Sequence, residues 1–126
     1  MTKRGPFVTE EQWSQVDREL WCIVRLTDNT EAKVYYVDGF LWRNYVDVGF
    51  VGGGHGWRDK YLKKDEIVIE RMLDAHDEVA FLHHELAEIA GYVRGEDYET
   101  AHKKANDSEA AYRRDTWQVP APHRED

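Results

Sequence analysis

The sequence predicts an α+β fold, in which a small twisted antiparallel sheet of three to five strands packs on two or three helices. Short apolar runs separated by turn residues occupy the first half of the chain, as is typical of strands. Glu66–Glu70 has the strict alternation of a half-buried strand, with Ile67 and Ile69 on one face. From Asp74 onward the pattern becomes that of two helices separated by Gly95.

The first elements expected are a helix over residues 10–20 and a strand at Trp21–Leu26. Thr9 and Gln12 have the spacing of a capping box, and apolar residues then recur on one helix face. Residues 27–30 are polar and turn-forming, so they should end the strand.

A β-hairpin is expected next, with strands at residues 33–37 and 40–43. The dipeptide Asp38-Gly39 between them is typical of a two-residue hairpin turn. Residues 45–51 alternate as a further strand. Residues 52–56 contain four glycines and are expected to form a loop without regular structure.

The second half predicts a helical hairpin. A core-facing apolar stripe indicates a helix over residues 77–94, and Gly95 is a natural terminator. Asp97 can cap a second helix that continues to about Arg114. The buried face of that second helix is expected to carry Tyr98, Ala101, His102, Ala105 and Tyr112.

Composition limits the possible partners and the setting. The 126 residues fit one domain, residues 1–126, of which 115–126 are expected to be a loose tail. The net charge of −8 argues against a nucleic-acid partner, because phosphate binding needs a basic surface. No apolar run is long enough for a membrane span or a secretion signal, and Cys22 is the single cysteine. These features favour a cytoplasmic protein that does not bind membranes, and they leave its oligomeric state open.

The strongest functional pattern is His84-Glu85-Leu86-Ala87-Glu88 on the first helix of the hairpin. His84 and Glu88 are four residues apart and therefore share one helix face. His102 lies eighteen residues after His84, on the inner face of the next helix, so a tight hairpin would bring it close. Two imidazoles and one carboxylate form a three-ligand metal set that leaves one coordination position open. Glu85 is then placed to act as the general base.

Two further residues are candidates near this site. Glu109 is seven residues after His102, and we expect it to orient a ligand or to pair with an arginine. His55 could bind a substrate oxyanion or the metal, although a histidine in so glycine-rich a segment is more often part of a mobile turn.

This arrangement resembles the zincin metallopeptidases, whose active helix carries His-Glu-x-x-His. In SprT-like members the third ligand is a histidine on the following helix at a comparable spacing. The phrase His84-Glu85-Leu86-Ala87-Glu88, followed by His102 and Glu109, is also similar to small zincin-like proteins of phages and bacteria. The chain departs from the family pattern where Glu88 replaces the second histidine. A carboxylate there would weaken the Lewis acidity of the metal.

The resemblance implies a zinc-dependent hydrolase that acts on peptide or protein substrates. Strand Glu66–Glu70 could then be the sheet edge to which an extended peptide adds. Iron is an alternative metal, because two histidines and one carboxylate also form the triad of non-haem iron sites. A rival hypothesis is a non-enzymatic, phage-type accessory or interaction module. In that case His84 and Glu88 are only a polar pair on a helix face.

Overall fold

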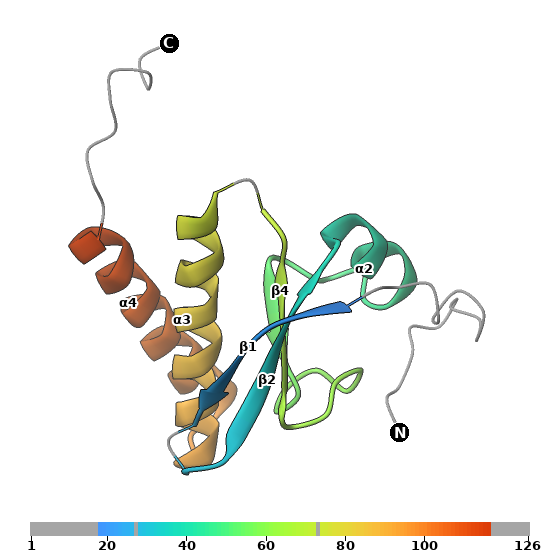
Figure 1. Ribbon diagram of the computed structural model, residues 1–126. Coiled ribbons are helices and arrows are strands. Elements are labelled where there is room, and N and C mark those ends of the chain that lie inside the picture. The colour runs from blue at the N-terminus through green and yellow to red at the C-terminus, as the bar shows by residue number, and fades with distance from the viewer. Residues whose placement is uncertain (1–17, 27, 73, 117–126) are drawn as a thin grey trace, which may run out of the picture.

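The computed structural model describes residues 18–26, 28–72 and 74–116, and shows an α+β arrangement (Figure 1). Its elements, in chain order, are β1 (Arg18–Arg25), β2 (Glu31–Val37), α2 (Gly39–Tyr45), β3 (Gly53–His55), β4 (Glu66–Glu70), α3 (Ala75–Val93) and α4 (Tyr98–Thr116). The four strands form one small sheet, and α3 lies between that sheet and α4. None of the helices in the described ranges is long and apolar enough to cross a bilayer.

The sheet is mixed, so the prediction of a wholly antiparallel sheet is wrong. Its strand order is β1-β2-β4-β3. The pairs β1/β2 and β3/β4 are antiparallel, whereas β2 and β4 are parallel, with Val34 opposite Ile67. The long connection between β2 and β4 contains α2 and β3, and it returns the chain to the same end of the sheet, as a parallel pair requires.

Strand β4 is a central strand rather than the half-buried strand that its sequence suggested. It pairs with β2 on one side and with β3 on the other. Ile67, Val68 and Ile69 are all completely buried, because both faces of the sheet are covered. Since β4 has no free edge, a peptide cannot add to it, and that part of the expectation is wrong.

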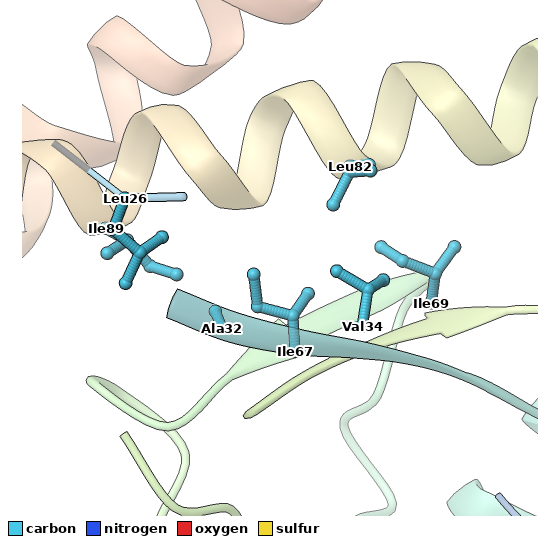
Figure 2. Close-up of a cluster of buried hydrophobic side chains, with 7 residues drawn as sticks. All are labelled: Leu26, Ala32, Val34, Ile67, Ile69, Leu82 and Ile89. Atoms are coloured by element: carbon cyan, nitrogen blue, oxygen red, sulfur yellow. The ribbon is translucent and has the colours of Figure 1, made fainter. Parts of the chain in front are cut away.

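One face of the sheet packs against α3. Figure 2 shows Val34, Ile67 and Ile69 directed from the strands toward the helix, and Leu82 and Ile89 directed back from α3. The opposite face packs against α2 and the segment that follows it. This second cluster consists of Val37, Trp42, Val46, Phe50, Leu62 and Val68. The alternation of side chains along β4 supplies residues to both clusters.

The segment after β2 is helical, so the expected hairpin over residues 33–43 is wrong. Asp38 ends the strand and caps α2, because its carboxylate accepts a hydrogen bond from the Leu41 backbone N–H at 3.1 Å. The strand expected at residues 45–51 is also absent, since α2 continues to Tyr45 and turns follow it. Conversely, the expected glycine loop forms strand β3 over three of its residues.

At the N-terminal end, the strand expected at Trp21–Leu26 is confirmed as part of β1, which ends at Arg25. β1 already begins at Arg18, so the helix expected over residues 10–20 is wrong at its last three positions, and its earlier part lies outside the described residues. The expected turn is confirmed at Asn29, which has a positive φ of 70°. Of the expected tail, residues 115 and 116 are helical, and the remainder lies outside the described residues.

The predicted helical hairpin is confirmed. Of the residues expected on the buried face of its second helix, Ala101 and Ala105 are buried and His102 and Tyr112 are partly buried, whereas Tyr98 is exposed and that part of the expectation is wrong. α3 starts after Asp74, whose side chain accepts a hydrogen bond from the His76 N–H at 2.8 Å. Gly95 ends it with a φ of 88°. The two helices pack closely because the contact residues are small: a Cβ on Gly91 would lie only 2.6 Å from the Cβ of Ala101. This close approach determines the distance between side chains on the facing surfaces of α3 and α4.

Candidate metal centre

The residues predicted for a metal site meet at one cavity. His84, Glu85 and Glu88 are buried on α3, and His102 reaches them from the second turn of α4. The centroids of the His84 and His102 rings lie 5.0 Å apart. The cavity has a volume of about 330 Å³, and all four of these residues, together with Glu109, line it.

Glu88 is the centre of the cluster. Its Oε2 accepts a hydrogen bond from Nδ1 of His102 at 2.7 Å and lies 3.6 Å from Nε2 of His84. The ligand atoms of these three residues all lie within 4.8 Å of one another. Ligands held about 2.0–2.2 Å from a tetrahedral zinc ion are themselves about 3.3–3.6 Å apart. The 3.6 Å contact is at the upper limit of that separation and the 2.7 Å contact is shorter, so a small movement of His102 away from Glu88 would accommodate an ion.

His55 is part of the same cluster, and it is not in a loop. It is the last residue of β3 and is completely buried. Its Nε2 donates a hydrogen bond of 2.7 Å to Oε1 of Glu88, the oxygen that faces away from His84 and His102. Its Nδ1 has no hydrogen-bond partner within the described part of the chain. His55 therefore contacts Glu88 on the opposite oxygen from His84 and His102.

The glycines around His55 explain how β3 approaches α3 so closely. A Cβ on Gly53 would lie 2.9 Å from Oε2 of Glu85, and a Cβ on Gly56 would lie 1.8 Å from the carbonyl oxygen of Lys63. Either side chain would push the strand away from the site. The glycine-rich segment is thus a condition of close packing rather than a sign of an irregular loop.

Three imidazoles keep Glu88 ionised. Burial alone would oppose its charge, but hydrogen bonds from His55 and His102, together with the close approach of His84, outweigh that cost and hold the pKa of Glu88 well below its usual range. Burial also opposes charge on His84, yet its contact with Glu88 and the nearby carboxylates raise the pKa of that imidazole. The cluster thus has an anionic centre surrounded by nitrogen donors.

Glu85 behaves in the opposite way. Burial raises the pKa of its carboxyl group to about 8, although the neighbouring His84 acts to lower it. Its nearest imidazole contact is 3.9 Å long, from Oε1 to Nε2 of His55. Among the described residues it makes no hydrogen bond that would stabilise a charge. His55, Glu85 and Glu88 also form a second group whose ligand atoms lie within 4.8 Å of one another.

Glu109 contacts both a histidine of the site and an arginine, the two kinds of partner that the sequence suggested. Its Oε1 lies 3.1 Å from Nδ1 of His84, and its Oε2 accepts a hydrogen bond of 3.0 Å from Arg113. Arg113 also binds Asp77 near the start of α3, which links the two helices. By contrast, the exposed His83 points away from the cavity and stacks on Tyr112.

Arg58, which was not predicted as a site residue from the sequence, also lines the cavity. It lies in the turn that follows β3, where its backbone N–H donates to the carbonyl of His55. Arg58 is only three residues after His55, but this spacing places it near the site only if His55 itself is buried there, which the sequence does not show.

No protein-family model matches the chain, and no match was found among curated proteins or solved structures. The function is therefore argued from the geometry of the site.

Proposed function

We propose that the protein is a metal-dependent hydrolase with a zincin-like site, that zinc is its metal, and that it cleaves peptide bonds. The observation that carries the proposal is the meeting of His84, Glu88 and His102 at one cavity beside the buried carboxyl group of Glu85, for which the structure gives no hydrogen bond among the described residues. Two imidazoles and one carboxylate are a known catalytic zinc set with an open position. Buried carboxyl groups with a raised pKa are typical of acid–base catalysis.

In this proposal His84 and His102 bind the metal through the nitrogens that face Glu88, and Glu88 binds through Oε2. Bound zinc would polarise the substrate carbonyl and make a coordinated water more acidic. The positive charge of a bound metal would favour the ionised form of Glu85. In that form Glu85 accepts a proton from the attacking water and delivers it to the leaving amine. Water adds to the carbonyl carbon and the C–N bond breaks, so the products are a carboxylic acid and an amine.

His55 and Glu109 are positioning residues in the same proposal. The hydrogen bond from His55 occupies Oε1 of Glu88, so Oε2, which faces His84 and His102, is the oxygen that would bind the metal. Oε1 of Glu109 lies 3.1 Å from Nδ1 of His84, the nitrogen that does not face Glu88. The two atoms are not aligned for a hydrogen bond, so a rotation of one side chain would be needed for Glu109 to accept that proton. Carboxylates in that position fix the ring orientation of metal-binding histidines.

Zinc is preferred over iron because Glu85 supplies a proton acceptor that hydrolysis uses directly. An iron site with the same ligands would need no such base. Metal analysis of the protein purified without added metal distinguishes the two, since an iron oxygenase must retain iron.

A second candidate function follows from the same hydrogen bonds. The nitrogens around Glu88 satisfy its charge without any metal, and a fully satisfied buried network can serve stability alone. The chain would then be a non-enzymatic interaction module of the phage accessory type, whose acidic surface binds a basic protein.

Metal content and turnover separate these functions. We expect the purified chain to bind zinc at one equivalent, and His84→Ala or His102→Ala to lose it. His83→Ala is the matched control, because it removes an adjacent histidine outside the cavity. Glu85→Gln should retain zinc and lose at least 100-fold in the rate of peptide hydrolysis. Absence of bound metal would refute the enzyme and favour the module.

A further inference from the structure

The cavity has one cationic side chain among the described residues that line it, namely Arg58. The acidic side chains that act on it are those of Asp59, Glu88 and Glu85. A single fixed positive charge beside a metal site can bind an anionic group of a substrate.

Arg58 is held in place but is not fully paired. Its Nε lies 3.5 Å from Oδ1 of Asp59, and its Nη1 donates to the hydroxyl of Tyr98 at 3.3 Å. Its Nη2 has no hydrogen-bond partner within the described ranges, and 40% of its side chain is exposed. Arg43, by comparison, forms two hydrogen bonds with both oxygens of Glu70. Arg58 therefore keeps donor capacity for a ligand.

The distance from Arg58 to the metal-binding residues limits the length of that ligand. Cζ of Arg58 lies 5.4 Å from the ring centroid of Tyr98, and the same ring stacks on His102 with centroids 5.0 Å apart. The guanidinium carbon is therefore at most about 10.4 Å from the His102 ring centre. Contacts of about 3 Å at each end leave at most roughly 4 Å between them, so no more than about one peptide residue fits between Arg58 and the metal-binding residues.

On the basis of the function proposed above, we propose that Arg58 binds the terminal carboxylate of the substrate, so that the enzyme removes the last residue of short peptides. A guanidinium forms a bidentate pair with a carboxylate. The volume of about 330 Å³ is at the low end for ligand pockets, which suits a short peptide. Phe81 and Val51 line the same cavity and provide apolar contact for a side chain.

In this reaction water adds to the carbonyl carbon of the last peptide bond, and the bond from that carbon to nitrogen breaks. The nitrogen takes the proton and leaves as the amino group of the C-terminal amino acid. That amino acid keeps its own carboxylate on Arg58 until it dissociates.

The test compares N-acetyl-alanyl-leucine with its C-terminal amide, using the full chain loaded with zinc. We expect kcat/KM for the acid to exceed that for the amide by at least 100-fold. Arg58→Gln should remove most of that preference, mainly through KM, while the bound zinc stays at one equivalent. Arg58→Lys should recover part of it. Arg25→Gln, on the distant strand β1, is the control and should change nothing.

Binding provides a second measurement that does not require turnover. In zinc-loaded Glu85→Gln protein, titration followed by NMR should show at least tenfold tighter binding of the acid than of the amide, and Arg58→Gln should abolish the difference. The assignment would be overturned if the wild type hydrolysed and bound the acid and the amide equally well, or bound neither. It would also be overturned if the preference for the acid survived in Arg58→Gln. If zinc and Glu85 are still required for hydrolysis, only the role of Arg58 fails. If zinc is not bound, the proposed function itself fails.

Discussion

The buried carboxyl group of Glu85 should destabilise the metal-free protein in a pH-dependent way. In the folded state its pKa is about 8, whereas the ordinary value in an unfolded chain is 4.5. The folded state therefore binds this proton more tightly than the unfolded state does. Stability is unaffected below about pH 4.5, falls as the pH rises toward 8, and stays low above that.

The size of the effect follows from the difference between the two pKa values. Each unit corresponds to about 1.4 kcal/mol, so the rise from 4.5 to about 8 costs about 5 kcal/mol above pH 8 and about 3 kcal/mol at pH 7. Glu85→Gln has nearly the same shape and no charge, so it should remove this cost. The unfolding free energy of the variant should exceed that of the wild type by less than about 1 kcal/mol at pH 5 and by about 5 kcal/mol at pH 8.5.

Urea unfolding in the presence of EDTA, at half-unit steps of pH, measures this difference. Subtracting the wild type from the variant at each pH cancels the titration of groups that both share. Glu99→Gln is the control, because Glu99 is exposed on α4 and does not line the cavity. If the difference for Glu85→Gln is as flat as that for Glu99→Gln, the carboxylate ionises without cost and the reasoning is refuted.

Three further predictions concern the same cluster. His55→Gln should weaken zinc binding by about 10–100-fold, because Glu88 loses the hydrogen bond that His55 donates to its Oε1. Competition with a fluorescent chelator measures the affinity, and an unchanged affinity would show that His55 does not position Glu88. Gly53→Ala should disturb the site, because the new methyl group would lie 2.9 Å from Glu85; a wild-type zinc affinity and wild-type turnover would contradict the close packing of β3 on α3. Zinc binding should release protons and tighten as the pH rises, because the contact with Glu88 raises the pKa of His84 and the metal must compete with a proton for that nitrogen. Calorimetry in buffers of different ionisation enthalpy measures the number of protons released. Zinc affinity that is independent of pH between 5 and 8 would exclude His84 as a ligand.

The helical hairpin could be predicted because its signals are local. Gly95 marks the end of the first helix and Asp97 the start of the second. An apolar stripe identifies the buried face of the first helix. Once those helices fold back on each other, the spacing of His84 and His102 brings them together. The same local rules therefore predicted this part of the candidate site.

The sheet could not be predicted in the same way, because its signals are ambiguous. Asp38-Gly39 is typical of a hairpin turn, but Asp38 is equally suited to cap a helix, and burial of Trp42 against the sheet decides between the two. In β4 the consecutive apolar residues Ile67, Val68 and Ile69 were a signal for burial on both faces. Which strands lie beside it depends on contacts distant in sequence.

His55 was difficult to assign for a related reason. The glycines that surround it are compatible with an irregular loop and equally with a strand that must approach another element closely. The contacts of Gly53 with Glu85 and of Gly56 with Lys63 distinguish these cases, and neither contact is visible in the sequence.

The most direct test of the metal site is a zinc titration of the chain after treatment with EDTA, performed on the wild type and three histidine variants. The account predicts one tightly bound equivalent in the wild type and in His83→Ala, and loss of that equivalent in His84→Ala and in His102→Ala. Failure of the wild type to bind zinc, or binding that survives in His84→Ala or in His102→Ala, would contradict it.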